Sequence, residues 1–449
     1  MPDHTERTER SDALVMLGLT GDLGRKKLFP AIYELAADDR LDGPVIGVGR
    51  SDHTDGELRE MFEDVLDDHE PAGGGDVDPD VARSVDLTYL AGDSTEQAVY
   101  DEMAERLEGR RRPLVYAALP PDLFGSVASG IAAADLPDTT RLVVEKPFGD
   151  GADAARALYA EITNSIAPDR LFIVDHFLAK AAIENMLIVR AVNPLLHNSL
   201  DATHVDAIDV IMHESGGVDG RGSFYEGVGA IQDVVQNHLL QMLAMVTMEP
   251  PVDDSDEAHH RARRDLLAAI EPVRPTDAVL GQYLGYRDLD DVADDSDVET
   301  FVWLSLSIDN DRWRGVPVSV RTGKRLREDR TEAIFHLRNT SPHHSNHGNR
   351  VRFSVKPAAS LSIDLDVMDS ETHEPKPTSV IACGPADHGE LGDYAVMFDN
   401  AMRGETRHFA QIDGIVEAWR VLDPLLADPP PLREYEPGSS GPSASPFDA

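Results

Sequence analysis

The sequence has a single cysteine and no long apolar run. Because Cys383 is alone among the 449 residues, no disulfide can form within the chain, and a reducing cytoplasm is the expected location. No stretch of 18 consecutive apolar residues occurs, and residues 1–12 are polar and acidic. We therefore expect neither a membrane span nor a signal peptide. A chain of this length has room for two or three domains with separate cores.

Basic residues are scarce in this sequence. Asp and Glu number 82 against 41 Lys and Arg, which gives a formal net charge of −41. Such a charge repels nucleic acids and anionic membranes, so neither is expected as a partner. The acids are spread along the whole chain, which is typical of a halophilic protein whose self-repulsion is screened by a cytoplasm rich in salt.

Lysine is rarer still, since only seven of the 41 basic residues are lysines. A chain that otherwise uses arginine is expected to keep lysine where a compact, mobile ammonium is useful. Five of the seven lie in the motifs described below: Lys26, Lys27, Lys146, Lys180 and Lys324.

The first motif is an apolar strand at 13–17 that runs into a glycine-rich turn. The turn contains Gly18, Gly21 and Gly24, and a helix with an apolar inner face follows it. Strand, turn and helix in this order are typical of a dinucleotide-binding domain, where glycines let the backbone approach a pyrophosphate. The spacing is GxxGxxG rather than GxGxxG, and the alternative is a glycine-rich turn of any other α/β protein.

The next strand, at 45–48, ends at a residue that bears on cofactor choice. An Asp or Glu at this point binds the ribose hydroxyls of NAD, whereas Arg50 suits the 2′-phosphate of NADP. Asp52 lies two residues on and weakens that preference. We therefore expect NADP as the cofactor, with NAD possible. A later strand from residue 141 ends at Lys146 and Pro147, which suits contact with both a cofactor and a substrate hydroxyl.

Residues 170–180, RLFIVDHFLAK, place three polar side chains directly after an apolar strand. If the chain stays extended, Asp175 and His176 point to opposite faces; if a helix starts just after, His176 and Lys180 share one face. A carboxylate can orient a catalytic base, and an imidazole beside an ammonium can bind a phosphate. The alternative is an ordinary strand end with capping contacts. A helix is expected over 181–192.

The second half of the sequence changes character. A strand at 207–213 ends near Glu214, and a glycine-rich loop then leads to an apolar helix at 233–246 that contains His238. A lone histidine on such a helix is more often a core residue than a catalytic one. At the α-helical period Asp233 lies about 140° around the helix from it. We expect an acidic loop at 253–260 and further strands at 301–308, 317–321, 350–355 and 361–367.

Six segments together resemble the glucose-6-phosphate dehydrogenases. They run in that family's order and cover roughly residues 13–425. An EKP turn after a dinucleotide-binding opening also occurs in other sugar dehydrogenases, but the DHxxxK and QNHLLQ segments do not accompany it there. The segments are GLTGDLGRKKLFP (18–30), YAALPP (116–121), RLVVEKPFG (141–149), DHFLAK (175–180), DVVQNHLLQM (233–242) and VRTGKRL (320–326).

The resemblance implies a role for each matching residue. His238 matches the general base, and Asp175 matches the carboxylate that orients it. The residues that match the cofactor site are Gly18, Gly21, Gly24, Lys27, Arg50 and Lys146. The residues that match the substrate site are Lys146, His176, Lys180, Glu214, Asp233 and Lys324. The implied reaction oxidises glucose 6-phosphate at C1 to the lactone with transfer of a hydride to NADP, and no metal takes part.

Two positions depart from the family pattern. Phe177 stands where the family usually has tyrosine, so one hydrogen bond to the phosphate is lost, and Lys356 stands where many members carry glutamine before proline. Two other functions remain as alternatives. One is an oxidoreductase of the glucose–fructose type, which acts on an unphosphorylated sugar, and the DHxxxK pair argues against it. The other is a non-catalytic NADP-binding regulator, against which the joint presence of Asp175, His238 and Lys146 argues.

The expected architecture is an α/β Rossmann domain followed by an α+β domain with a large, mainly antiparallel sheet. We place the NAD(P)-binding domain at 1–174, the substrate-binding and dimerisation domain at 175–427, and a disordered Pro/Ser-rich tail at 428–449. The resemblance also implies a homodimer, formed through the large sheet, or a dimer of dimers.

Overall fold

The computed structural model describes residues 10–339, 348–383 and 391–442. The chain forms two compact units, each built from two separate stretches of sequence. Unit 1 comprises Met1–Ala179 and His388–Ile412, and unit 2 comprises Lys180–Asp387 and Asp413–Ala449. The division into 1–174 and 175–427 expected from the sequence treats each domain as one continuous stretch, which the two units are not.

Unit 1 contains a six-stranded parallel sheet in the order β3-β2-β1-β4-β5-β6. Its strands are short apolar runs, as expected for a parallel sheet covered on both faces. The order reverses between β1 and β4, and ligands of such sheets bind beyond the carboxyl ends of the strands at this switch point. The bounds are β1 (Ala13–Leu17), β2 (Val45–Gly49), β3 (Leu87–Ala91), β4 (Pro113–Ala117), β5 (Arg141–Val144) and β6 (Leu171–Ile173). The Rossmann prediction is confirmed.

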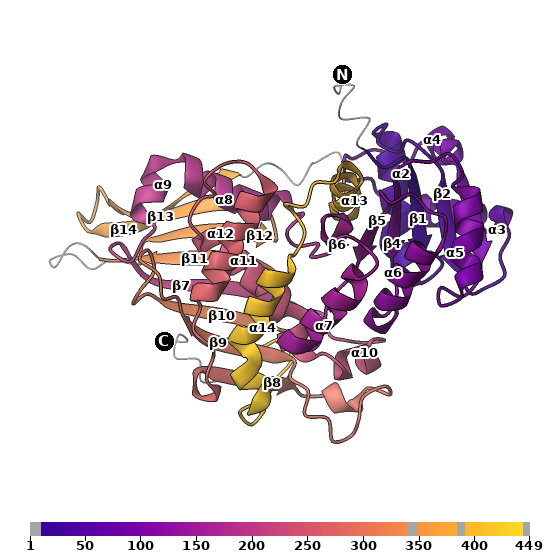
Figure 1. Ribbon diagram of the computed structural model, residues 1–449. Helices are drawn as coiled ribbons and strands as arrows, with labels where there is room; N and C mark the ends of the chain where they lie inside the picture. The colour runs from indigo at the N-terminus through magenta and orange to yellow at the C-terminus, as the bar shows by residue number, and fades with distance from the viewer. Residues whose placement is uncertain (1–9, 340–347, 384–390, 443–449) are drawn as a thin grey trace. The chain divides into compact units, whose positions relative to one another are not determined.

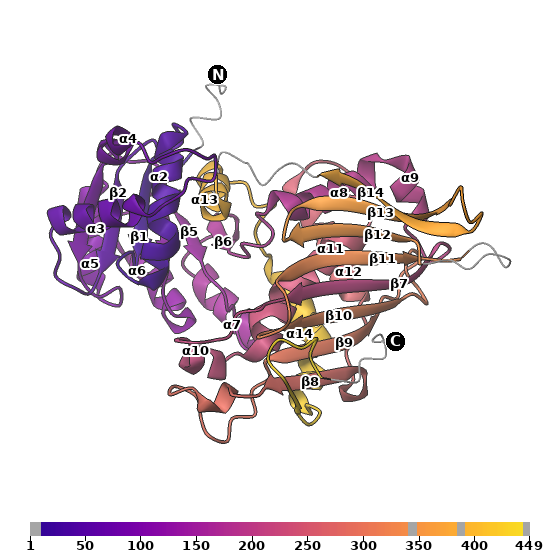
Figure 2. The same ribbon diagram turned by 180° about the vertical axis from the view of Figure 1, so that it is seen from behind.

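Helices flank this sheet, as Figures 1 and 2 show. Their inner faces are apolar; in α3, for example, the buried residues are Leu58, Phe62 and Leu66, and a Thr54–Glu57 capping box fixes the first turn. The main helical elements are η1 (Gly24–Leu28), α2 (Phe29–Ala37), α3 (Asp55–Asp67), α4 (Pro79–Ser84), α5 (Gln97–Arg106), α6 (Phe124–Ala133), α7 (Ala152–Thr163) and α13 (Asp393–Arg403). Two 3₁₀ turns are η2 (Pro121–Leu123) and η3 (Pro168–Arg170).

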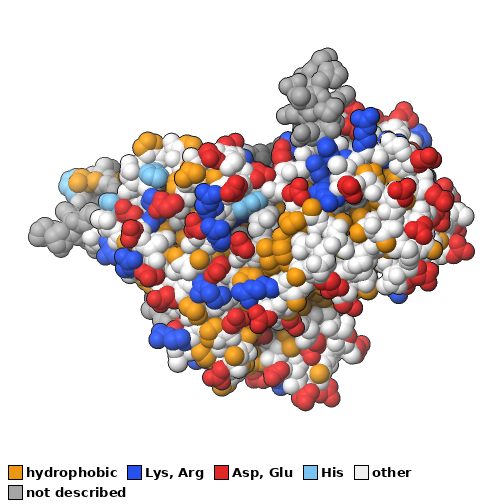
Figure 3. Space-filling model, viewed as in Figure 1, with side chains coloured by type: hydrophobic (Ala, Val, Ile, Leu, Met, Phe, Trp, Pro, Cys, Tyr) orange, Lys and Arg blue, Asp and Glu red, His pale blue; other side chains and the backbone are white. Residues whose placement is uncertain are grey.

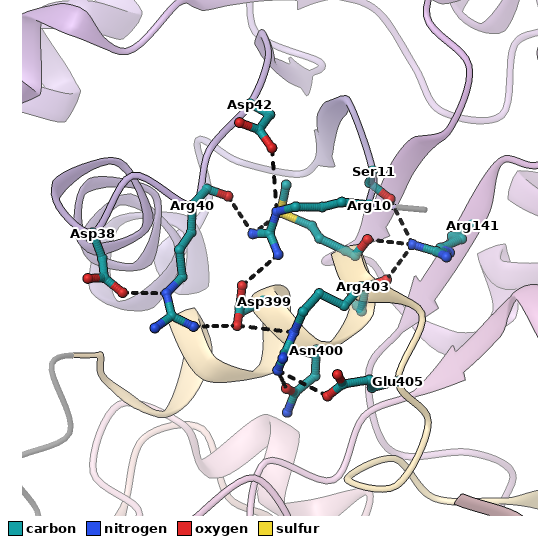
Figure 4. A network of polar contacts seen from close by, with 12 residues as sticks. Arg10, Ser11, Asp38, Arg40, Asp42, Arg141, Asp399, Asn400, Arg403 and Glu405 are labelled. Carbon is teal, nitrogen blue, oxygen red and sulfur yellow. Dashed lines mark hydrogen bonds and ion pairs between the residues drawn. The ribbon is translucent and has the colours of Figure 1, made fainter. Parts of the chain in front are cut away.

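Helix α13 belongs to unit 1 although it follows the large sheet in sequence. Its Asp399 is only 2% exposed and lies among three arginines, with nitrogen–oxygen distances of 2.7 Å to Arg10, 2.7 Å to Arg40 and 3.4 Å to Arg403 (Figure 4). Arg141 adds hydrogen bonds to the last carbonyl groups of the helix. The contacts explain why this late segment returns to unit 1, since a buried carboxylate must be paired.

Unit 2 is built on a nine-stranded sheet in the order β14-β13-β12-β11-β7-β10-β9-β8-β15. All neighbouring pairs are antiparallel except β7 with β10 and β8 with β15. The predicted large, mainly antiparallel sheet is therefore confirmed. The bounds are β7 (Val205–His213), β8 (Ala278–Tyr283), β9 (Phe301–Ser307), β10 (Pro317–Gly323), β11 (Arg330–Leu337), β12 (Arg350–Lys356), β13 (Ser360–Met368), β14 (Pro375–Cys383) and β15 (Arg433–Tyr435).

The helices of unit 2 cover one face of this sheet. Figure 1 shows α8, α11, α12 and α14 in front of the strands, and Figure 2 shows the opposite face, which carries no helix in the described part of unit 2. The helical elements are α8 (Ala181–Val192), α9 (Pro194–Ser199), α10 (Gly222–Glu226), η4 (Ile231–Leu239), α11 (Leu240–Thr247), α12 (Asp256–Ala269), η5 (Pro275–Asp277), η6 (Tyr286–Asp288) and α14 (Ile412–Ala427). Across the residues that the structure describes, no helix is long and apolar enough to cross a membrane.

Two segments differ from the sequence-based expectation. The acidic loop expected at 253–260 is wrong from residue 256 on, because α12 starts there and buries Ala258, Leu266 and Leu267 while its acids face outward. The disordered tail expected at 428–449 does not hold for 428–442. There β15 pairs with β8, and Tyr435, which is 4% exposed, donates a hydrogen bond to the carbonyl oxygen of Lys324 at 2.7 Å. Residues 443–449 lie outside the described residues.

Candidate active site

A cleft of about 600 Å³ opens at the carboxyl ends of β1, β2 and β4 in unit 1. It lies at the switch point of the sheet, where nucleotides bind in this architecture. Gly18 and Gly21 line one part of the cleft, and Arg50 and Asp93 line another. The YAALPP segment contributes Pro120. A backbone-lined floor beside a cation suits a ligand that carries phosphates.

Gly18 is required by its surroundings. Its φ is +82°, and a Cβ at this position would lie 2.6 Å from the carbonyl oxygen of Ala118. Its N–H donates to the carbonyl oxygen of Val48 at 2.8 Å, which ties the turn to β2. Any other side chain would both strain the backbone and push β1 and β4 apart. The glycine turn therefore keeps the backbone, rather than side chains, at this edge of the cleft.

Gly24 and Lys27 are placed differently from the other predicted cofactor residues. A Cβ on Gly24 would lie 1.6 Å from the carbonyl oxygen of Leu19, so this glycine serves the close contact between turn and helix. Lys27 is exposed on η1. Neither residue is among those that line the cleft.

Lys146 follows β5 and stands next to a buried polar group. Its neighbour Glu145 is 9% exposed and accepts hydrogen bonds from the hydroxyl groups of Tyr116 at 2.5 Å and Tyr394 at 3.3 Å. Burial raises the pKa of Glu145, and the hydrogen bond from Tyr116 and the charge of Lys146 oppose this effect. Two tyrosines from distant segments therefore fix the backbone that delivers Lys146.

The segment after β6 forms a turn rather than a strand or a helix. The N–H of Leu178 donates to the carbonyl oxygen of Asp175 at 3.0 Å, and the Asp175 carboxylate accepts from the N–H of Phe177 at 3.0 Å. Asp175 is buried at 3% exposure and His176 is half-buried. Helix α8 begins only at Ala181, so neither arrangement considered from the sequence, an extended pair or a shared helix face, applies here.

Unit 2 brings together three of the predicted substrate residues. The Lys324 ammonium forms an ion pair with Glu214 and lies 3.7 Å from a carboxylate oxygen of Asp233. Lys324 is only 5% exposed, and its ammonium lies 5.7 Å from the ring centroid of Tyr225. Burial and then the charge of Asp233 raise the pKa of Tyr225 well above its usual value. This set is called the Lys324 cluster below. It can both donate and accept hydrogen bonds, as recognition of a polyhydroxyl ligand requires.

His238 lies in η4, which is a π-helix. Its side chain is buried at 4% exposure. Because a π-helix has more residues per turn than an α-helix, Asp233 and His238 lie closer in angle than the 140° expected at the α-helical period. The Glu299 carboxylate accepts from the N–H of Ile231 at 2.8 Å and so holds the start of this helix.

Both halves of the chain match models of one protein family. Residues 15–185 match the glucose-6-phosphate dehydrogenase NAD binding domain, and residues 187–446 match the glucose-6-phosphate dehydrogenase C-terminal domain. The chain belongs to the glucose-6-phosphate dehydrogenase family.

Individual members of the glucose-6-phosphate dehydrogenase family are similar over almost the whole chain. Glucose-6-phosphate 1-dehydrogenase 1 of Mycobacterium tuberculosis is 37% identical over 447 residues, which cover 97% of this chain and 94% of the relative. A solved structure of glucose-6-phosphate 1-dehydrogenase from Mycobacterium avium is 35% identical with a TM-score of 0.90, and it covers 97% of this chain and 95% of its own. A glucose-6-phosphate dehydrogenase solved in complex with its substrate glucose 6-phosphate is 27% identical with a TM-score of 0.89, over 97% and 96% of the two chains.

The cleft of unit 1 fits a dinucleotide. Its glycine turn offers backbone at the switch point, and Arg50 supplies a cation at the end of β2. Among the described residues there is no group of three or more His, Cys, Asp or Glu side chains arranged to hold a metal ion.

The sequence-based prediction did not include several residues that lie beside the predicted site residues. Tyr225 and Tyr435 belong to the surroundings of Lys324, Tyr394 to those of Glu145, and Asp93 to the cleft. The two adjacent aromatic residues in the glycine-rich stretch around 216–229, Phe224 and Tyr225, were a usable signal for Tyr225. Tyr394 and Tyr435 carried no such signal, because each reaches its place through contacts with residues more than 100 positions away.

Proposed function

We propose that this protein oxidises glucose 6-phosphate at C1 to 6-phosphoglucono-1,5-lactone with NADP as the hydride acceptor. The match of both family domains across residues 15–446 is the observation that carries the proposal. It is supported by relatives of similar length, whose names contain the same substrate. A reaction of this kind is the entry to the oxidative pentose phosphate pathway.

His238 is proposed as the general base. It removes the proton of the C1 hydroxyl group while the hydrogen on C1 leaves as a hydride, so that a C=O bond forms. When bound, the nicotinamide ring of NADP accepts that hydride. Asp175 is proposed to orient the imidazole and to stabilise its protonated form, by analogy with other His–Asp pairs. Both assignments rest on the family motifs that contain these residues.

The Lys324 cluster is proposed to bind the sugar, with Glu214 and Asp233 accepting from its hydroxyl groups. The contacts of Lys324 support this, because its ammonium lies beside both carboxylates and fixes their orientation. Lys146 is proposed to contact both cofactor and sugar. Gly18, Gly21 and Arg50 are proposed to hold NADP, with Gly24 and Lys27 supporting the turn and helix beside it.

His176 and Lys180 are proposed to bind the phosphate of the substrate. Binding energy at the phosphate is remote from C1 and can be used to position the reacting carbon. Phe177 is 2% exposed and lacks the hydroxyl group that tyrosine supplies in most family members. The phosphate site is therefore proposed to rely on His176 and Lys180 more than it does in relatives with tyrosine.

The decisive experiment compares glucose 6-phosphate with glucose as substrates, each with NADP and with NAD, in buffers from 0.1 to 3 M KCl. Rapid reduction of NADP with glucose 6-phosphate, and little with glucose, is the expected result. Faster turnover of glucose would favour a glucose–fructose-type oxidoreductase instead. No turnover of either sugar, together with NADP binding in calorimetry, would favour a non-catalytic regulator.

A homodimer, or a dimer of dimers, is proposed to form through the large sheet. The sheet face without helices supports this, as do the exposed apolar side chains of β13 and of the edge strand β14, with Leu365 at 40%, Val380 at 56% and Ile381 at 65% exposure. Sedimentation equilibrium of Ile381→Lys against the unchanged protein tests this.

A cytoplasmic location with high salt is proposed from the single cysteine and the acid excess, and cell fractionation tests it.

A further inference from the structure

The cleft contains two charged side chains of opposite sign that come from neighbouring strands. Gly49 and Ala91 are partners in the pairing of β2 with β3. Arg50 comes directly after Gly49, and Asp93 comes two residues after Ala91. Both line the cleft, and they are the only charged residues among the described ones that do so. Asp52, the acid nearest to Arg50 in the sequence, does not line it.

Asp93 is held firmly in this place. One carboxylate oxygen accepts from both the N–H of Thr95 at 2.9 Å and its hydroxyl group at 2.8 Å. The loop around it is tied to β2 by the bond from the N–H of Gly92 to Gly49, and to α5 by the bond from Tyr100 to the carbonyl oxygen of Ser94 at 2.6 Å. The other carboxylate oxygen takes no part in these bonds.

Asp93 is ionised at neutral pH. The two hydrogen bonds from Thr95 lower the pKa of its carboxyl group, and the positive charge of Arg50 lowers it further. Among the described residues, Arg50 and Asp93 form no ion pair with each other, although the charge of Arg50 lowers the pKa of Asp93. A ligand group can therefore lie between them.

We propose that Asp93 sets the cofactor preference of this site by opposing Arg50 across the adenosine ribose. The proposal rests on the proposed NADP-dependent reaction and names a specificity residue for it. A carboxylate accepts a hydrogen bond from a ribose 2′-hydroxyl group, as in sites that take NAD, whereas it repels a 2′-phosphate. Arg50 has the reverse preference, because its guanidinium binds a phosphate in a bidentate manner. One cleft therefore contains a group suited to each cofactor.

The preference for NADP over NAD is therefore smaller than Arg50 alone would produce, and NAD remains usable as a cofactor. Removal of the charge on Asp93 weakens the contact to the 2′-hydroxyl group of NAD and relieves repulsion of the 2′-phosphate of NADP. Both effects change the ratio of the two affinities in the same direction. The matched control is Asp52, which carries the same charge and lies two residues after Arg50 in the sequence but does not line the cleft.

The test measures binding of ADP-ribose and 2′-phospho-ADP-ribose by calorimetry for Asp93→Asn, Asp52→Asn and the unchanged protein. In Asp93→Asn we expect the preference for the 2′-phosphorylated ligand to rise about tenfold, the effect of one charge-assisted contact, and in Asp52→Asn to change less than about twofold. The kcat/KM ratio for NADP over NAD should follow. Equal changes for both ligands would place Asp93 at the adenine and overturn the proposal, as would a larger effect in Asp52→Asn.

The test still decides the role of Asp93 if one variant does not fold or if the protein does not oxidise glucose 6-phosphate. Asn retains an oxygen that can accept from Thr95, and Asp93→Ser, whose melting temperature is measured alongside, provides a second variant with an acceptor at this position. A rise in preference in either folded variant supports the proposal, and no rise in both contradicts it. Because the ligands lack nicotinamide, the result does not depend on catalysis. If the enzyme failed to oxidise glucose 6-phosphate, the proposed function would fall while the binding ratio still decided the role of Asp93.

Discussion

The ring of Tyr394 is stacked on the imidazole of His176, with ring centroids 6.4 Å apart and planes inclined by 18°. Tyr394 lies in α13, more than 200 residues after His176, and its hydroxyl group donates to Glu145 beside Lys146. One side chain of the returning helix thus contacts two of the segments proposed to bind substrate. The orientation of His176 depends on a residue that no motif contains.

Replacement of Tyr394 should therefore weaken phosphate binding. In Tyr394→Leu the stacking is lost, and we expect the KM for glucose 6-phosphate to rise about two- to tenfold, because such ring pairs are worth ~0.5–1.5 kcal/mol. The kcat should change less than the KM. Tyr394→Phe keeps the ring and serves as the control, with a KM near that of the unchanged enzyme. Equal effects of Leu and Phe would assign the role to the hydroxyl group instead.

His238→Asn should remove the general base while leaving binding largely intact. We expect kcat to fall by about 10²–10⁴-fold, which is the usual contribution of a positioned base, with a small change in the KM for glucose 6-phosphate. Steady-state kinetics from pH 6 to 10 provide the measurement, and part of the loss should be recovered at high pH, where hydroxide replaces the base. A variant with near-normal kcat would disprove the assignment.

Asp399→Asn should destabilise unit 1. The change removes the charge that Arg10, Arg40 and Arg403 share, and loss of one partner from a buried ionic group costs about 3–5 kcal/mol. Guanidinium unfolding followed by fluorescence measures the loss. The control is Glu405→Gln, which breaks a more exposed pair with Arg403 and should cost less than about 1 kcal/mol. Similar losses of unfolding free energy in both variants would show that the buried contacts of Asp399 stabilise the protein no more than the exposed pair does.

Glu299 should make stability depend on pH. Burial raises the pKa of Glu299 to about 7, against an ordinary value of 4.5. Since the folded form then holds a proton that the unfolded chain has released, this stabilising contribution is complete below pH 4.5 and is lost as pH rises through 7. Melting temperatures of the unchanged protein, relative to Glu299→Gln, should therefore fall between pH 5 and 8. A constant difference between the two proteins would mean that the carboxyl group is already ionised at pH 5.

Thermal stability should rise steeply with salt. Figure 3 shows acidic side chains scattered over the visible face, and the net charge is −41. Self-repulsion extends over about 10 Å at 0.1 M salt but only about 3 Å at 1 M. Melting temperatures in KCl from 0.1 to 3 M provide the measurement, with sucrose of equal osmolality as the uncharged control. A flat profile in KCl, or the same rise in sucrose, would contradict a screening effect.

The sequence predicted unit 1 better than unit 2 for a physical reason. Parallel strands buried on both faces are continuous apolar runs, so β1 and β2 stand out against their polar flanks. Helix α12 did not stand out, because its first two residues continue the acidic run of 253–257, which resembles a loop. The short strand β15 follows a proline-rich stretch and is defined by its pairing with β8, which no local pattern reveals.

The same distinction applies to the site. The glycine turn and Arg50 were found because their spacing relative to a strand is local, and the roles of His238 and Lys324 came from the family resemblance. Asp93 was missed, although it follows β3, because a single acid in an acidic chain gives no signal. Asp52 was chosen for its nearness to Arg50 in the sequence, whereas the adjacent strand places Asp93 at the cleft.

The placement of α13 also has a consequence during synthesis of the chain. All six strands of the first sheet are synthesised before residue 180. The helix that carries Asp399 and Tyr394 is synthesised about 200 residues later. At about 5–20 residues per second, this corresponds to a wait of roughly 10–40 s. During that interval the faces of Tyr116 and Phe172 that later contact Phe398 and Phe409 stay uncovered. We therefore expect the nascent nucleotide-binding unit to expose apolar surface to chaperones until translation is nearly complete.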